Sequence, residues 1–158
     1  MSDTYTKLSD TLSSKEGSAY ITINGRNRKM FEISKLEAQL ELAINDKQML
    51  GHRMKQHKIV GCEGSGSMTY YFMNSEMANA AIDYVNSGHF EGFTIMVTNE
   101  DPQSTVGKNE VALYNVIPKK FPLAHIDDSS DDPITVDTDI TFDSVSSLSS
   151  FNLPANYR

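Results

Sequence analysis

Cysteine is nearly absent from this sequence, which contains only Cys62. A single cysteine cannot form an internal disulfide or supply a cysteine-based metal site. A fold held together by disulfides is therefore excluded. We expect Cys62 to be a small, half-buried side chain in a glycine-rich strand.

Long apolar runs are also missing. The hydrophobic fraction is 39% of 158 residues, and no stretch approaches the roughly 18 consecutive apolar residues of a membrane span. The start, Met1 to Lys7, lacks the basic and then apolar pattern of a secretory signal. We therefore expect one domain, made and folded in a cytoplasm, with no membrane binding.

Positive charge is scarce, since 14 basic residues stand against 21 acidic ones and the net charge is -7. The molecule as a whole should repel nucleic acid. Only the segment 46–58 is strongly basic, and its length is typical of a connection that is functional or ordered by a partner.

The segment 35–45 alternates apolar and polar residues. Its apolar positions are Leu36, Ala38, Leu40, Leu42 and Ile44. These residue types favour a helix by propensity, but a helix would place Ala38 and Leu42 opposite the other apolar side chains. The period of two predicts a long amphipathic strand.

A second extended segment, 59–73, returns after the basic connection. Gly61, Gly64 and Gly66 are too frequent for an ordinary strand interior, which suggests bends, bulges or close approach by another backbone. We therefore expect a long hairpin with the basic segment at its end.

Elsewhere, apolar alternation predicts further strands at 18–24, 93–98, 111–116 and 134–142. Asn24 and Gly25 predict a tight turn, because both tolerate positive φ. We expect extended structure to resume at Met30 and Phe31 and to lead into the long strand.

One segment has helical periodicity. A single stripe is formed by Met77, Ala80, Ala81, Tyr84 and Val85. The helix should run from 76 to 87, with Asn74 or Ser75 as N-cap and Gly88 in the left-handed conformation at its end. We expect the stripe to cover one face of a sheet.

These elements predict a mainly β protein with six or seven antiparallel strands and one flanking α-helix, either a β-sandwich or a rolled barrel. Residues 14–143 should form this domain. Residues 1–13 are interpreted as a flexible arm that orders against a neighbour, and residues 144–158 as a Ser-rich tail.

The residue patterns of catalytic and metal sites are missing. His52 and His57 have the wrong spacing for a helical metal site and lie among cations. The acidic segment 127–132 lacks the glycine and glutamate of a hand-type calcium loop. The segment 61–67 is neither a P-loop nor a nucleophile elbow. We expect no enzymatic activity and no cofactor.

The basic segment leaves two interpretations open. One is a protein interface, in which the basic loop meets the acidic loop 127–132 of another subunit. The alternative is a β-sheet domain that binds nucleic acid or a sugar through residues 47–58, although interleaved aromatic residues are missing there.

Several segments together resemble the tail tube (core tail) proteins of contractile phage tails and phage-tail-like particles of Gram-positive bacteria, including defective prophages and R-type bacteriocins. The matching segments are Ser14-Lys-Glu-Gly-Ser-Ala19, Lys35-Leu-Glu-Ala38, Leu50-Gly-His-Arg-Met-Lys-Gln-His-Lys58, Gly64-Ser-Gly-Ser-Met-Thr69, Val97-Thr-Asn-Glu-Asp-Pro102 and Asp139-Ile-Thr-Phe-Asp143. The resemblance covers roughly residues 14–143.

The resemblance implies a structural protein that forms sixfold rings stacked into a hollow tube. Two long hairpins per subunit would build a continuous inner barrel. The side chains of Glu37, Gln39 and Glu41 would face the lumen. Contacts between rings or subunits would involve Leu50, Gly51, His52, Arg53, Met54, Lys55, His57 and Lys58, together with Asp127, Asp128, Asp131 and Asp132.

The resemblance also implies partners and a location. The partners would be further copies of the chain, the tail sheath, the tape-measure protein, and baseplate and tail terminator proteins, with DNA present only in transit. The subunit would be assembled in the bacterial host cytoplasm and reside in a virion tail or a phage-tail-like particle. The sequence does not distinguish an infectious phage from a bacteriocin-like particle.

Overall fold

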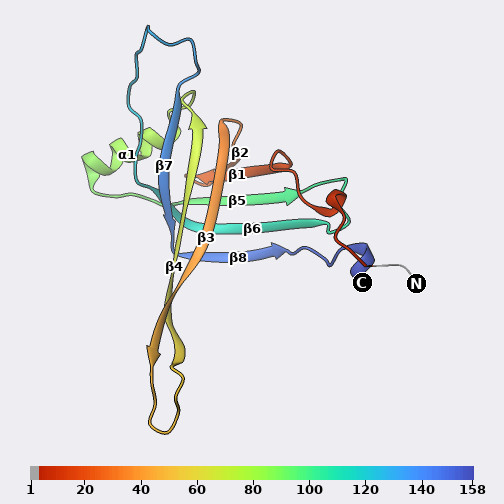
Figure 1. Cartoon of the computed structure of the whole chain (residues 1–158). Helices are drawn as coiled ribbons and strands as arrows, with labels where there is room; N and C mark the ends of the chain where they lie inside the picture. Colours follow the sequence, from red (N-terminus) through yellow and green to blue (C-terminus); the bar gives the residue numbers. More distant parts are fainter. Residues whose placement is uncertain (1–3) are drawn as a thin grey trace.

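The computed structural model describes residues 4–158, in which there are eight β-strands and one α-helix (Figure 1). The first four strands are β1 (Gly17–Ile23), β2 (Arg26–Lys29), β3 (Ile33–Lys47) and β4 (Gln56–Tyr71). The helix α1 (Glu76–Ser87) is followed by β5 (Phe93–Glu100), β6 (Lys108–Pro118), β7 (Thr135–Phe142) and β8 (Ser144–Ser149). Short 3-10 turns lie at Leu8–Asp10 and Ala155–Tyr157.

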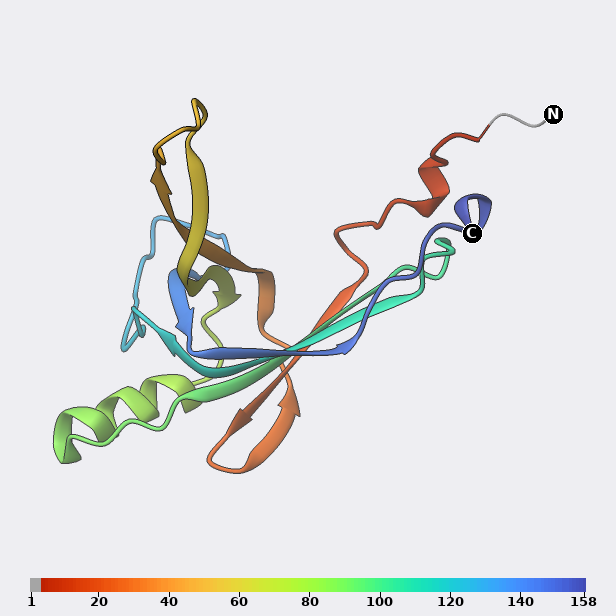
Figure 2. The same cartoon turned by 90° about the horizontal axis from the view of Figure 1, so that it is seen from below.

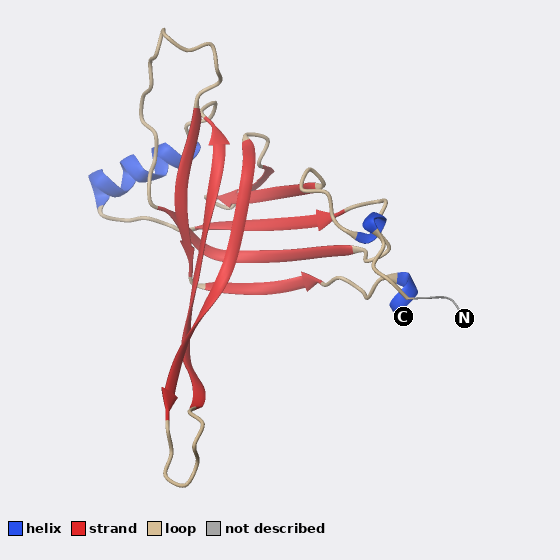
Figure 3. Cartoon of the chain, viewed as in Figure 1, coloured by secondary structure: helices blue, strands red, loops and turns tan. Residues whose placement is uncertain are grey.

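The strands form two layers whose directions cross, and all pairings are antiparallel (Figures 1 and 3). One layer has the order β2-β1-β5-β6, with β8 on the second edge of β6. The other layer has the order β7-β4-β3. The predicted antiparallel fold with a flanking helix is confirmed. It has eight strands rather than six or seven, because β2 and β8 were not predicted.

The layers are joined by β6, which bends as it passes from one to the other (Figure 2). Asn115 has a φ of 55°, and the pairing of β5 with β6 shifts register at this point. Beyond the bend, Ile117 and Pro118 pair with β7. Asparagine tolerates positive φ, and its side-chain amide donates a hydrogen bond to the Asp143 carboxylate. Asn115 therefore lies at the bend and links it to Asp143, between β7 and β8.

The core lies between the layers. The first layer contributes Ile21, Phe93, Ile95 and Val116, and the second contributes Met68, Tyr70, Ile140 and Phe142. A Cβ at Gly64 of β4 would overlap the Phe142 ring. A Cβ at Gly66 would overlap the carbonyl oxygen of Glu37. The predicted close approach by another backbone is confirmed at Gly66, whereas the neighbour of Gly64 is a side chain.

A buried ion pair stabilises the turn between β2 and β3. The Arg28 guanidinium donates two hydrogen bonds of 3.0 Å to the fully buried Glu32 carboxylate, and its Nε donates to Glu76 at 3.0 Å. Burial, together with the Glu32 charge, raises the pKa of Tyr70 to about 12. The prediction that extended structure resumes at Met30 and Phe31 is wrong, because β2 ends at Lys29 and a turn follows.

Helix α1 has the predicted bounds. The Glu76 backbone N–H donates to the Asn74 side chain at 2.7 Å, and Gly88 ends the helix with a φ of 77°. The apolar stripe, however, is covered only in its first half. Met77 is buried, whereas Tyr84 and Val85 are 54% and 80% exposed. The prediction that the stripe covers a sheet face fails for the last turns, because the helix extends beyond the strands (Figure 2).

The segment predicted as a Ser-rich tail, 144–158, begins with β8, which pairs with β6. Of the predicted arm, residues 1–3 lie outside the described residues. The remainder packs on the loop between β5 and β6. The Thr105 backbone N–H and Oγ1 donate to the buried Asp10 carboxylate at 3.0 and 2.7 Å, and the Ala155 N–H donates to Thr105 Oγ1 at 2.9 Å. Both terminal segments therefore meet at one end of the first layer.

Candidate assembly surfaces

The layer β3-β4-β7 has one polar face. Glu37 and Gln39 of β3 lie opposite Ser67 and Ser65 of β4, and Ser67 lies opposite Asp139 of β7. These side chains line a shallow depression. Alternation along each strand directs them to the same side of the sheet.

This polar face is acidic over the body of the protein. It carries Glu37, Glu41, Glu63, Asp137 and Asp139. The Lys35 ammonium lies 3.5 Å from the Glu37 carboxylate, and the Thr69 hydroxyl donates to Asp137 at 2.6 Å. The excess of carboxylates gives the face a negative potential.

The sequence-predicted residues Glu37, Gln39 and Glu41 share this face, and all three are exposed. Sequence reasoning missed the acidic residues of the neighbouring strands. Alternation along 134–142 places Asp137 and Asp139 on one face of that strand. It could not show that β7 pairs with β4, which places these carboxylates beside those of β3.

The edge of this layer is open along β3. β3 is the last strand in the sheet order, so within residues 4–158 its second edge has no strand partner. The strand runs over 15 residues from Ile33 to Lys47, far longer than the usual five or six. A long open edge is a template for pairing with another chain.

The opposite face of the β3-β4 hairpin is apolar, but the protein covers only its base. Leu40, Leu42 and Ile44 of β3 are 54%, 48% and 58% exposed, and Ile59 lies opposite Ile44. Cys62 lies opposite Leu42 and is exposed, so the expectation of a half-buried cysteine is wrong. We call Leu40, Leu42, Ile44, Ile59 and Cys62 the stem face. It begins at Leu40, opposite Gly64, where the pairing of β4 with β7 ends, and continues onto the part of the hairpin that extends beyond the body (Figure 1).

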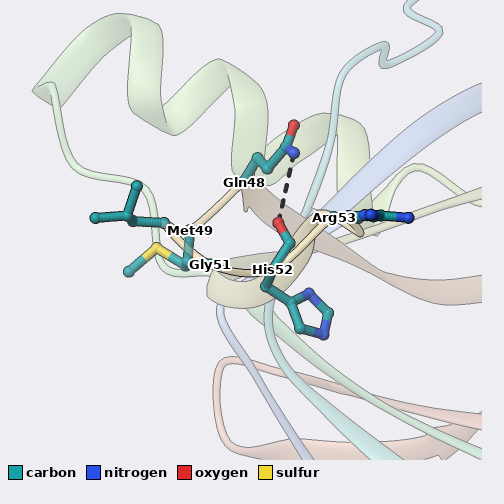
Figure 4. Close-up of a pocket in the computed structure, with 6 residues that line it drawn as sticks. Gln48, Met49, Gly51, His52 and Arg53 are labelled. Atoms are coloured by element: carbon teal, nitrogen blue, oxygen red, sulfur yellow. Dashed lines mark hydrogen bonds between the residues drawn. The ribbon is translucent and has the colours of Figure 1, made fainter.

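The end of the hairpin is a loop held by its own hydrogen bonds (Figure 4). Gln48 donates to the His52 carbonyl at 3.4 Å, and His52 Nδ1 lies 2.9 Å from the Met54 carbonyl. The strands extend further than expected, so the connection predicted at 46–58 is reduced to 48–55, which we call the tip. The hollow of the tip is lined by this loop alone and open to solvent.

Basic residues gather at the tip and the adjoining strand ends. They are Lys47, Arg53, Lys55 and Lys58, accompanied by His52 and His57. Lys55 lies 3.5 Å from Asp46. Leu50 and Met54 are exposed between these charges, and Gly51 has a φ of 85°. The tip therefore presents both charge and apolar side chains.

The acidic loop lies at the opposite end of the molecule (Figure 1). Its residues Asp127, Asp128, Asp131 and Asp132 are exposed in the connection between β6 and β7. The Ser129 hydroxyl and backbone N–H donate to the Asp127 carboxylate at 2.6 and 3.0 Å, which lowers its pKa. The structure therefore does not bring the basic and acidic loops together within one copy.

The described part of the chain has neither a candidate metal cluster nor a helix that could span a membrane. Residues 4–158 contain no cluster of three or more His, Cys, Asp or Glu side chains placed to hold a metal ion. Among the same residues, no helix has the length and apolar character needed to span a membrane.

Similarity to known proteins identifies the family. The family model described as "Phage tail tube protein" matches residues 4–149. The phage-like element PBSX protein XkdM of Bacillus subtilis (strain 168) is 30% identical over 125 residues, which are 79% of this chain and 82% of that protein. The uncharacterized protein YqbM of the same organism is 32% identical over 110 residues, or 70% and 72% of the two chains.

Solved structures agree in fold. A chain of an extracellular contractile injection system, solved as a PVC sheath-tube complex in the extended state, has a TM-score of 0.63 and 10% identity, covering 89% of this chain and 93% of that one. A chain of the anti-feeding prophage cap has a TM-score of 0.68 and 9% identity, covering 94% and 97%. The predicted resemblance is confirmed, and the chain belongs to the phage tail tube protein family.

Proposed function

We propose that this tail tube subunit forms sixfold rings that stack into a hollow tube and that its role is purely structural. The supporting observation is the long β3-β4 hairpin, which is polar on one face, exposed and apolar on the other, and open along the β3 edge. For a monomer, such an edge is an aggregation hazard. Closing a sheet into a barrel removes its edges altogether.

The polar face of β3-β4-β7 lines the bore in this proposal. Glu37, Gln39 and Glu41 then face the lumen, beside Glu63 and Asp139 of the neighbouring strands. Repetition around a ring multiplies the negative potential. A polyanion such as DNA passes without sticking, because carboxylates outnumber the cation of this face, Lys35, which lies 3.5 Å from the Glu37 carboxylate.

Stacking uses the two ends of the molecule. The basic tip residues of one ring meet the acidic loop 127–132 of the next, since these loops lie at opposite ends of one copy (Figure 1). Opposite potentials steer the rings together and fix their register. The lowered pKa of Asp127 keeps its carboxylate charged in mildly acidic solution.

The proposed partners follow from the family and from the assemblies in which similar folds occur. They are the tail sheath around the tube, baseplate and terminator proteins at its ends, and a tape-measure protein or DNA inside it. The tube would be assembled in the bacterial cytoplasm and belong to a phage tail or a phage-tail-like particle. Family membership does not favour the alternative of nucleic-acid or sugar binding through residues 47–58.

The test is to concentrate the purified protein and examine it by size-exclusion chromatography and negative-stain electron microscopy. We expect hollow filaments of uniform width. The native thiol provides a second readout, because Cys62 is exposed in the single copy. Its reaction with a maleimide should be fast in dilute monomer and slow in filaments.

A monomer that forms no filaments at high concentration, even with a baseplate extract as template, would overturn the proposal. Salt-dependent binding of that monomer to DNA would instead favour the nucleic-acid alternative.

A further inference from the structure

Two apolar surfaces of this chain are left uncovered by its own fold. One is the stem face on the protruding part of the hairpin. The other is the exposed end of the α1 stripe, formed by Tyr84 and Val85 with Ile82 beside them. We call this second surface the helix overhang.

The helix overhang has the pattern of a buried surface. The stripe begins at buried Met77, continues through half-buried Ala80 and Ala81, and ends at Tyr84 and Val85 in solvent. An apolar stripe along a helix indicates a covered face. Within residues 4–158 the last turns stay exposed, so we expect another chain to cover them.

The surroundings of the overhang add to this surface. Phe121, at the start of the β6-β7 connection, packs edge-on against Phe90 just after α1, with ring centroids 6.0 Å apart. The same connection then exposes Leu123 and Ile126 before it reaches the acidic residues at 127–132. An apolar patch and an acidic loop are therefore neighbours at one end of the molecule (Figure 1).

The other end has the matching arrangement. There the apolar stem face adjoins the basic tip, which carries Arg53 and Lys55. Lys58 follows at the start of β4. Each end thus combines an apolar surface with a charged loop, and the two charges are opposite. One copy cannot join its own two ends, because they lie far apart along the hairpin direction (Figure 1).

We infer that the helix overhang docks on the stem face of a second copy in the neighbouring ring. This inference rests on the proposed function and deepens it. When copies stack along the hairpin direction, the end that carries the stem face and the basic tip points towards the end of the next copy that carries the helix overhang and the acidic loop (Figure 1). The charges give register, while burial of the apolar side chains supplies the main driving force for stacking.

The experiment uses the native thiol in the middle of the stem face. A Val85→Cys variant is assembled into tubes, treated with copper phenanthroline as an oxidant that joins adjacent thiols into disulfides, and separated on a non-reducing denaturing gel. We expect a ladder of covalent oligomers, because every copy carries both reactive positions. Wild-type tubes and the Cys62→Ser/Val85→Cys variant should give no ladder.

Asn86→Cys is the matched control, since Asn86 is exposed at the same end of α1 but on its polar side. It should give no ladder with Cys62. Tubes of Val85→Cys without a ladder, or an equal ladder from Asn86→Cys, would overturn the docking while leaving the tube proposal intact. Absence of tubes from the wild-type protein would overturn both.

A second variant pair covers the case in which Val85→Cys fails to assemble. Val85→Asp should remain folded by circular dichroism yet reduce the mass of sedimented tubes about tenfold or more, because a valine-sized burial is lost at every contact. Asn86→Asp should sediment like the wild type. Normal tube mass from Val85→Asp would also overturn the docking.

Discussion

At the scale of single residues, Gly64 shows how tightly β7 packs on β4. A methyl group there would overlap the Phe142 ring. We expect Gly64→Ala to lower the free energy of unfolding by about 1–3 kcal/mol, measured by urea denaturation. Gly61→Ala is the control, because its Cβ meets open space in the described structure and should change stability by about 0.5 kcal/mol or less. Equal effects would contradict this account of β4.

The ion pair at the start of β3 depends on a buried carboxylate. In Arg28→Ala, the fully buried Glu32 loses its cation, and we expect the free energy of unfolding to fall by about 3–5 kcal/mol. The exposed pair Lys35–Glu37 is the comparison, and Lys35→Ala should cost less than about 1 kcal/mol. Thermal unfolding of both variants measures these changes in stability. A similar loss of stability in the two variants would show that burial of Glu32 does not matter.

Asp10 makes attachment of the N-terminal segment depend on pH. Hydrogen bonds from the Thr105 hydroxyl and backbone N–H lower the pKa of its carboxyl below the ordinary value of 3.8. Because the folded pKa is below the unfolded one, the stabilisation is complete above pH 3.8 and is lost as the pH falls through the folded pKa.

Hydrogen exchange at the Thr105 amide tests this dependence. Protection should fall in strong acid in the wild type. Asp10→Asn should not show the fall, because its side-chain oxygen accepts the same hydrogen bonds without titrating. Identical pH profiles for the two proteins would assign the acid sensitivity to another group.

At the scale of secondary structure, we expect the basic residues at the end of the hairpin to be needed for assembly but not for folding. We expect the triple variant Arg53→Ala, Lys55→Ala, Lys58→Ala to unfold at the wild-type temperature, because exposed charges contribute little to stability. It should form no tubes. A control that removes the exposed cations Lys15, Arg26 and Lys29 changes the net charge equally and should form tubes of normal length.

The outcome is read by sedimentation and electron microscopy of both variants. Tubes of normal length from the tip variant would contradict its role in stacking. If neither variant forms tubes, the change in net charge, rather than the loss of the tip residues, would explain the defect.

The elements that could be predicted from sequence are those with regular periodicity. The alternation of 35–45 and the stripe of 76–87 have unambiguous periods, so β3 and α1 were predicted correctly. β2 consists of Arg26-Asn-Arg-Lys29, and four of the six residues of β8 are serine, so neither has an apolar pattern. Both form because a partner strand is available, which is a property of the tertiary structure.

The surfaces were less predictable than the strands. Sequence alternation placed Glu37, Gln39 and Glu41 on one face, but not the neighbouring acidic side chains, which depend on the pairing of β4 with the distant β7. The stripe of α1 indicated a covered face. It did not show that the last turns of the helix extend beyond the core and are exposed. Where an element stops being covered depends on the whole fold.

At the scale of the whole molecule, the proposed bore can be tested by reversing its charge. In tubes of the Glu37→Lys/Glu41→Lys variant, we expect DNA binding that weakens steeply with salt, while wild-type tubes should not bind. Particles built from the variant should deliver their contents more slowly. A control with Glu91→Lys and Glu100→Lys, exposed outside the polar face, should behave as the wild type. Unchanged delivery by the first variant would contradict the bore assignment.

The unlike ends of the subunit have a consequence for the finished tube. A contact between two different surfaces leaves one of each exposed after every addition, so it never closes and builds an open filament. Such a filament has direction: one end presents tips, and the other presents acidic loops and helix overhangs. Because the same contact adds every ring in the proposed stack, we expect the subunit to carry no information about length and a separate component to act as the ruler.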